Sequence, residues 1–226
     1  MLILSLDTAI QRCSVAITRE GAPLCVRAVN MERGHAEHLA PMVAAAIGEA
    51  GVEPLEIDRI GVVAGPGGFT GVRVALSFAR AFSLAANAPA VGVSSLAALS
   101  AKAMEKSDAR AAAAMIDARR GEVYAGLYDR DGVCIATDFV APPEEAFAQL
   151  SRAAAGADVV LTGSGAGLGA APHGWARIEG EDQIDPVIVA KLAAAADDPT
   201  APPAPIYLRA PDAKPPAVKL GPTPGG

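Results

Sequence analysis

The residues with the clearest potential for chemistry form a glycine-rich loop between an apolar run and a helix-like segment. The stretch 60–76 reads IGVVAGPGGFTGVRVAL, and a strand, a glycine loop and a helix in this order commonly bind phosphate through backbone N–H groups. Thr70 is a candidate helix cap, and Arg73 adds a positive charge. The alternative is a tight turn that needs glycine only for backbone freedom or close packing. The loop glycines are Gly65, Gly67, Gly68 and Gly71.

This loop matches neither of two well-known nucleotide motifs. A Walker A loop ends in Lys followed by Ser or Thr, whereas Val72 and Arg73 follow Gly71 here. A dinucleotide fingerprint needs its third glycine one place earlier and an acidic residue about 20 positions downstream. No Asp or Glu occurs between Ile60 and Met104. The pattern therefore indicates an anion site or a structural turn, and it argues against NAD.

Two carboxylates at strand ends are further candidates for a nucleotide site. Asp7 and Thr8 follow the apolar run LILSL, and Asp117 ends an equivalent run later in the chain. Carboxylates in these places coordinate Mg²⁺-bound phosphate in two-lobed nucleotide-binding folds. The alternative is an aspartate that only makes a hydrogen bond within its turn.

The histidines and serines predict neither a metal site nor a catalytic group. His35 and His38 lie three apart in GHAEH, so they do not match HExxH, and the only other histidine is His173. The string GSGAG at 163–167 lacks the residue between Gly and Ser that a nucleophile elbow requires. We therefore expect no bound metal and no autonomous catalysis.

The composition argues against direct nucleic-acid binding and against a membrane protein. The 226-residue chain has a formal net charge of −6 and 4% aromatic residues, so it offers RNA few cations and few stacking rings. The N-terminus reaches Asp7 without a basic leader, and the longest uncharged run, 81–101, is interrupted by Asn87 and Pro89. We expect a cytoplasmic protein without a membrane segment.

The order of predicted elements indicates a duplicated α/β protein. Alternating runs, helical spacing and turn residues predict three strands, a helix, a strand and a helix. The string LSLDTAIQRCSVAIT at 4–18 is similar to AMIDARRGEVYAGLY at 114–128, which indicates two related βββαβα units, the second shortened. The predicted parts are an N-terminal lobe at 1–105, a C-terminal lobe at 106–198 and a proline-rich tail at 199–226. Apart from the string PIYLRAP at 205–211, the tail is expected to be extended and mobile.

Two predicted helices are more apolar than a surface helix should be. The helix 72–86 is apolar nearly all round, and much of the outer face of the helix 36–50 is Ala, Gly or Pro. Such helices are either sandwiched within the fold or exposed to a partner subunit. The residues predicted to form a partner interface are Leu39, Met42, Val43, Ala46, Val74, Phe78 and Ala81.

Several strings, taken together, resemble the TsaB (YeaZ) family over nearly the whole chain and in the right order. They are LSLDTAIQRCSVAI, GPGGFTGVRVALSFARAFSLA, VGVSSLAAL, IDARRGEVYAGLY and PIYLRAP. The resemblance implies a two-lobed actin-like/Hsp70-type ATPase (ASKHA) fold. It also implies a role in making N6-threonylcarbamoyladenosine (t6A) at position 37 of tRNAs that read ANN codons.

The same resemblance implies a subunit that is not itself the transferase. The implied catalyst is the paralogue TsaD, whose two metal-binding histidines correspond to Ser95 and Leu99 here, and neither residue can replace an imidazole ligand. TsaE is the implied ATPase partner, and TsaC supplies threonylcarbamoyl-adenylate. No intrinsic cofactor is expected, and ATP or ADP is expected to bind only within the complex.

The resulting prediction is a scaffold subunit that presents the helices 36–50 and 72–86 to TsaD or to a second copy of itself. tRNA is expected to be contacted only through the complex. Two other classes stay open, namely an autonomous kinase of the same superfamily and an independent nucleotide-binding regulator. A kinase would need a phosphate site in both lobes, and a regulator would bind nucleotide alone.

Overall fold

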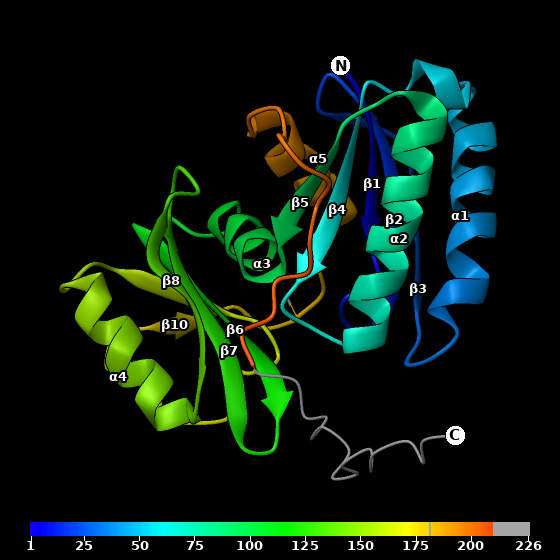
Figure 1. Cartoon of the computed structure of the whole chain (residues 1–226). Helices are drawn as coiled ribbons and strands as arrows, with labels where there is room; N and C mark the ends of the chain where they lie inside the picture. The colour runs from blue at the N-terminus through cyan, green and yellow to red at the C-terminus, as the bar shows by residue number, and fades with distance from the viewer. Residues whose placement is uncertain (181, 210–226) are drawn as a thin grey trace, which may run out of the picture.

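The computed structural model describes residues 1–180 and 182–209. They form two lobes, each built on a five-stranded sheet (Figure 1). The strand order is β3-β2-β1-β4-β5 in the first sheet and β8-β7-β6-β9-β10 in the second, so both sheets have one topology. In each, a three-stranded antiparallel part is followed by parallel strands. The duplicated α/β architecture predicted from the repeated strings is therefore confirmed.

The helices and strands have the following bounds. The first half contains β1 (Leu2–Asp7), β2 (Arg12–Arg19), β3 (Ala22–Asn30), α1 (His35–Ala50), the short 3-10 helix η1 (Pro54–Glu56), β4 (Arg59–Gly65), α2 (Phe69–Ala86), β5 (Ala90–Ser94) and α3 (Ser95–Met104). The second half contains β6 (Ala111–Arg119), β7 (Glu122–Asp129), β8 (Cys134–Ala141), α4 (Pro143–Ala154), β9 (Val159–Thr162), β10 (Ala176–Arg177) and α5 (Pro186–Ala195). The second copy is shortened because no helix joins β9 to β10.

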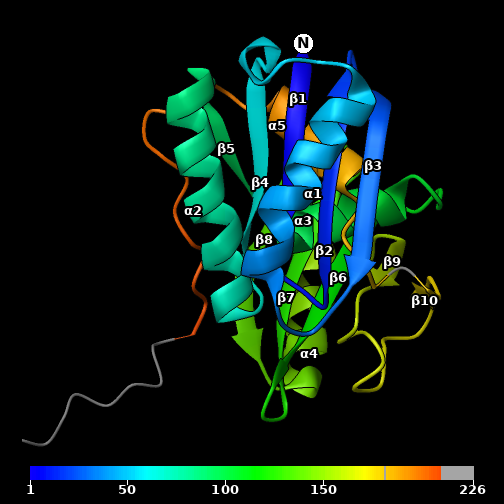
Figure 2. The same ribbon diagram turned by 90° about the vertical axis from the view of Figure 1, so that its right-hand side faces the viewer.

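The first sheet is covered on both faces. In Figure 2, α1 and α2 lie in front of this sheet and α5 lies behind it. Every residue of β1 and β4 is buried, with Leu4, Leu6 and Ile60 fully inaccessible. Parallel strands buried on both sides are nearly continuous apolar runs, and LILSL and RIGVVAG depart from this only at Ser5 and Arg59.

The placement of α5 differs from the predicted division of the chain. The segment 106–198 was expected to form the second lobe, but α5 packs on β1, β2 and β4 of the first sheet. Val189 and Ala193 belong to the first lobe's core, and a Cβ at Gly61 would come within 2.9 Å of the Ala193 Cβ. The helix returns to the first lobe because the back of that sheet would otherwise expose apolar strands to water.

The first part of the predicted tail is docked on the first lobe. Pro203 is buried, and the Ile206 N–H donates to the carbonyl oxygen of Ala64 at 2.8 Å. Specific contacts hold this segment, and its residues 205–209 belong to the string PIYLRAP, which the prediction set apart from the extended, mobile part of the tail. We call the segment 203–209 the strap; the rest of the predicted tail, 210–226, lies outside the described residues.

The two lobes meet at the start of α3. Ser94 caps this helix by accepting from the N–H groups of Leu96 and Ala97, and its hydroxyl donates to Asp138 in β8 at 2.7 Å. The Tyr128 hydroxyl donates to the other Asp138 oxygen. Burial raises the pKa of the Asp138 carboxyl above its usual range. A helix cap of the first lobe is thus hydrogen-bonded to a half-buried carboxylate of the second.

By length and composition alone, α2 is the one helix among residues 1–180 and 182–209 that could cross a membrane, with 18 residues and a mean hydropathy of 1.2. Its inner face, which includes Val72 and Leu76, is buried on the sheet, and its outer face carries Arg73 and Arg80. In this fold α2 is a covering helix of the first lobe.

Candidate functional site

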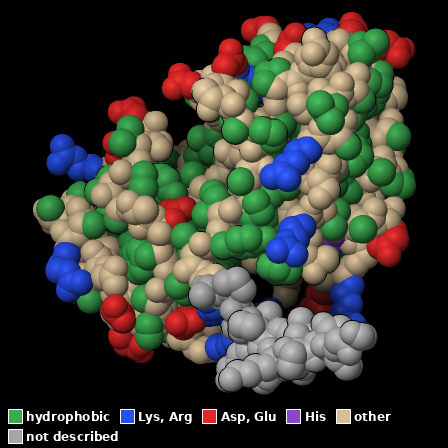
Figure 3. Space-filling view, in the orientation of Figure 1, with side chains coloured by type: hydrophobic (Ala, Val, Ile, Leu, Met, Phe, Trp, Pro, Cys, Tyr) green, Lys and Arg blue, Asp and Glu red, His purple; other side chains and the backbone are tan. Residues whose placement is uncertain are grey.

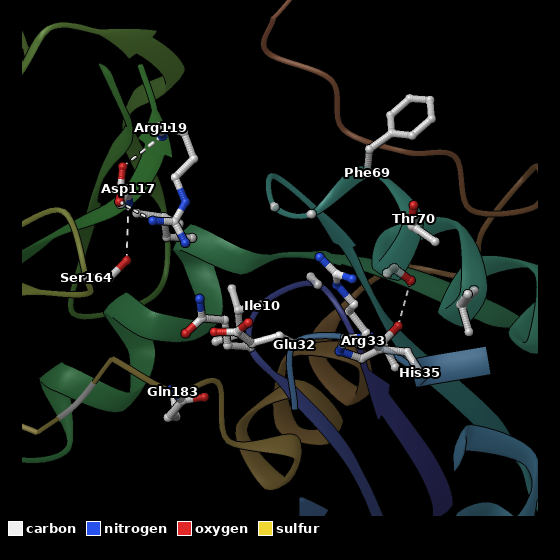
Figure 4. A pocket seen from close by; sticks show the side chains of 18 of the residues that line it. Ile10, Glu32, Arg33, His35, Phe69, Thr70, Asp117, Arg119, Ser164 and Gln183 are labelled. Carbon is white, nitrogen blue, oxygen red and sulfur yellow. Dashed lines mark hydrogen bonds and ion pairs between the residues drawn. The ribbon is translucent and has the colours of Figure 1, made fainter. Parts of the chain in front are cut away.

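A cleft of about 830 Å³ lies between the two lobes and collects most of the predicted nucleotide-site residues (Figure 4). The first lobe contributes the turn after β1, the segment 32–37 and the glycine loop. The second lobe contributes the end of β6 and Ser164. Asp7 does not line the cleft, because its side chain is fully buried beneath it.

The glycine loop packs on the turn between β1 and β2. A Cβ at Gly71 would overlap the carbonyl oxygen of Thr8, and one at Gly67 would overlap that of Ala9. The Gly68 N–H donates to Ala9 O at 2.7 Å, and the Thr8 hydroxyl donates to Gly71 O at 2.6 Å. Close backbone approach alone accounts for glycine at 67 and 71.

Thr70 and Arg73 do not take the places predicted for them. The helix α2 begins at Phe69 with Gly68 as its N-cap and no side-chain cap hydrogen bond, so Thr70 lies within the first turn. The Arg73 guanidinium lies 3.6 Å over the Phe69 ring, and its Nε donates to the Tyr207 hydroxyl. Its charge is therefore turned toward the strap and not toward a phosphate in the loop.

Asp7 is a buried acid and not a cleft-facing ligand. One carboxyl oxygen accepts from the Ala9 N–H at 2.8 Å, and the other has no hydrogen-bond partner among the described residues. Burial raises the pKa of Asp7 to about 7, although the Ala9 N–H and the nearby Arg12 oppose the shift. The buried position thus strongly disfavours a charged carboxylate.

Asp117 faces the cleft, but its carboxylate forms an ion pair with an arginine of its own lobe. Its Oδ1 accepts from the Arg119 N–H at 2.8 Å, and its Oδ2 pairs with the Arg119 guanidinium at 3.3 Å (Figure 4). The turn that follows β9 repeats the glycine contact of the first lobe, because a Cβ at Gly163 would overlap the carbonyl oxygen of Met115. An arginine side chain thus lies where a phosphate-bound cation would meet Asp117.

The histidines are not gathered into a metal site. No group of three or more His, Cys, Asp or Glu side chains suited to a metal occurs in the described ranges. His35 lines the cleft, while His38 is bonded through Nδ1 to Gly34 O at 2.9 Å. Ser95 and Leu99, the positions that the family resemblance compares with metal ligands, are buried in the core.

The predicted interface residues fall into two groups. Leu39, Val43 and Ala46 are buried in the chain's own core, because helical spacing of large apolar residues marks the face turned to the sheet. Met42, Val74 and Phe78 are partly buried, and Ala81 is exposed. Val43 and Ala46 therefore cannot offer their side chains to a partner, while Leu39, although buried, lines the groove described next.

A groove of about 510 Å³ runs between α1 and α2 on the outside of the first lobe. Its walls include Ala36 and Ala40 of α1 and Phe69, Val74 and Phe78 of α2. In Figure 3 hydrophobic side chains are scattered over this lobe, and Lys or Arg side chains lie along α2. Of the residues predicted for a partner interface, Leu39, Val74 and Phe78 line this groove, whereas Phe69 and Ala40 were not among the predicted residues.

Two duplicated lobes around a cleft define the actin-like ATPase fold. The chain is similar in fold to component A of (R)-2-hydroxyglutaryl-CoA dehydratase from Acidaminococcus fermentans, with a TM-score of 0.50 at 12% identity over 85% of this chain and 97% of that one. YeaZ from Pseudomonas aeruginosa is much more similar, with a TM-score of 0.81 and 32% identity over 92% of this chain and 99% of that one.

Sequence comparison agrees with the structural match. The family model described as TsaD, tRNA N6-adenosine threonylcarbamoyltransferase, matches residues 29–167. The Escherichia coli tRNA threonylcarbamoyladenosine biosynthesis protein TsaB is 38% identical over 136 residues, which are 58% of this chain and 56% of that protein. The match thus spans just over half of that relative's length. The chain belongs to the TsaB/YeaZ family.

The packing of the glycine loop predicts opposite effects for two glycine substitutions. Gly71→Ala should lower the melting temperature strongly or prevent soluble expression, because the new methyl group overlaps Thr8 O. Gly68→Ala should be tolerated, since its Cβ would lie 3.5 Å from Ala9 O and its φ of −62° suits alanine. Thermal unfolding of both purified variants measures this. Equal stability of the two would contradict the packing role.

The burial of Asp7 predicts a pH-dependent loss of stability. Its pKa of about 7 lies above the unfolded value of 3.8, so the folded state binds the proton more tightly and loses stability as the pH rises toward 7. Asp7→Asn keeps the acceptor for Ala9 and removes this loss. Its melting temperature relative to wild type should rise from pH 5 to about pH 7 and then level off. A difference that does not change with pH would show that Asp7 is not buried as an acid.

Proposed function

We propose that this chain is a non-catalytic subunit in t6A biosynthesis that acts by pairing with TsaD. The observation that carries the proposal is the cleft, where Asp7 is buried beneath the floor and Asp117 is paired with Arg119. A phosphate-bound cation would need both carboxylates free and charged. Family membership and the burial of Ser95 and Leu99 support the same reading.

The groove between α1 and α2 is the proposed docking surface for TsaD. Its walls combine small residues such as Ala36 and Ala40 with the larger Phe69 and Phe78, and small residues allow another helix to approach closely. TsaE is proposed to join this pair, and a second copy of the chain would use the same groove when TsaD is absent. ATP or ADP would bind only once the complex has formed.

tRNA is proposed to reach the protein only through the complex in the cytoplasm. A chain with a net charge of −6 releases few counterions from a phosphate backbone, so its own affinity for tRNA should be weak. The partner would then supply the cations.

Complementation tests the proposed function directly. Expression of this chain in a bacterium depleted of its own TsaB should restore t6A, measured by mass spectrometry of nucleosides from purified tRNA. Expression of TsaD alone should not restore it. Failure of the chain to restore t6A beside its own cognate TsaD would contradict the proposal.

The groove predicts a pair of matched variants on α1. Ala40→Asp places a carboxylate in the groove at an exposed position, so the chain should fold normally. Co-purification with TsaD should weaken by roughly a hundredfold or more, because the complex would bury an unpaired charge. Ala45→Asp makes the same change on the same helix, at an exposed position outside the groove.

Size-exclusion chromatography and titration calorimetry with TsaD compare the two variants with wild type. Ala45→Asp should bind as wild type does, and equal binding by Ala40→Asp would rule out the groove. Phe78 is a poorer choice for this test, because it is partly buried against the core and stacks on Phe82 with ring centroids 6.0 Å apart. A charge there would also disturb folding.

A further inference from the structure

The strap is attached to both lobes. In the first lobe, the Arg80 side chain donates to Pro203 O at 2.6 and 3.1 Å, and Ile206 is hydrogen-bonded to the end of β4. In the second lobe, Arg209 pairs with Glu122 and donates to the carbonyl oxygen of Ala118 at 3.2 Å. Figure 1 shows the strap crossing from the first sheet beside α2 to β6 and β7.

Between these anchors the strap adds a ring to the start of α2. Tyr207 stacks on Phe69 with ring centroids 5.7 Å apart and an interplanar angle of 25°. The Arg73 guanidinium carbon lies 3.6 Å from the Phe69 centroid and 5.8 Å from that of Tyr207, and its Nε donates to the Tyr207 hydroxyl at 2.8 Å. One guanidinium is thus fixed by two rings and one hydrogen bond.

This cluster forms one rim of the groove. Phe69 and Arg73 line the groove, although Phe69 is 53% exposed and Tyr207 is 49% exposed. Exposed rings usually keep their rotamer freedom, and fixing them on binding costs free energy. The strap removes that freedom in advance. Within the part of the chain that the structure describes, nothing accepts a hydrogen bond from the two terminal nitrogens of Arg73.

We propose that the strap builds one end of the partner-binding surface. Tyr207 holds Phe69 and Arg73 at the rim, where they receive a partner helix that has an apolar face and a carboxylate beside it. The apolar groove between two helices suits a third helix, and the fixed guanidinium suits a carboxylate that accepts from both terminal nitrogens. This inference rests on the proposed pairing with TsaD.

A protein partner fits this rim better than a nucleic acid does. The two rings already stack on each other and on Arg73, so their adjoining faces are not free for bases. The chain is also acidic overall, with a net charge of −6. tRNA therefore serves as a competing probe: tight binding of tRNA by the isolated chain, lost in Arg73→Gln, would overturn the proposal.

The test uses the full-length chain and measures its affinity for TsaD by calorimetry. Tyr207→Ala removes a half-exposed ring, so the melting temperature should change little, while the affinity should fall about tenfold. Tyr207→Phe keeps the stacked ring and should stay within about threefold of wild type. Arg73→Gln should lose about tenfold and should also reduce the fall in affinity between about 0.05 M and 0.5 M salt.

The possible failures are distinguishable. If wild type does not bind TsaD at all, the proposed function itself is contradicted. If wild type binds and Tyr207→Ala binds equally well, the strap has no part in the surface and this inference alone is overturned. An Arg73→Gln complex with the affinity and salt dependence of wild type would overturn it in the same way.

Discussion

The contact between the start of α2 and the turn after β1 is the constraint on which the first lobe depends. Because Gly67 and Gly71 have no Cβ, Gly67 can contact the carbonyl group of Ala9, and Gly71 can contact that of Thr8. Two hydrogen bonds also join the loop to the turn. Because the turn ends β1 and the loop ends β4, the contact fixes α2 across two neighbouring strands. The groove, one wall of the cleft and the strap all use α2, so their positions follow from this contact.

The second lobe repeats the contact without the helix. Gly163 and Gly165 bring the turn after β9 against Met115 and Ile116 at the end of β6. No helix lies in the described segment 163–175 between this turn and β10, so the second lobe has no counterpart of α2. Its cleft-facing end carries Arg119 at a φ of 63° instead, and the side chain neutralises Asp117. Both lobes thus share one sheet topology, and only the first has a helix in the position of α2.

Local patterns predicted most of the fold, because strand alternation, helical spacing and glycine turns are local properties. They did not place α5, since a helical period does not say which sheet the helix covers. They also did not separate the buried from the accessible residues of α1. Large apolar residues such as Leu39 and Val43 mark its inward face, and the groove wall that α1 provides consists of Leu39 with the small residues Ala36 and Ala40. The contact of Arg73 with Tyr207 spans 134 positions, and no local pattern reports it.

The cleft and the groove differ in the free-energy cost of binding a ligand. A phosphate with its cation would have to displace Arg119 from Asp117. It would also meet Asp7 beneath the floor of the cleft, where burial raises the pKa to about 7 and leaves the carboxyl only partly charged at neutral pH. A helix entering the groove displaces only water from apolar walls, which contributes about 25 cal/mol per Å² of apolar surface. Arg73 is already fixed by two rings there. These differences support the proposal that the chain acts by assembly and not by binding nucleotide on its own.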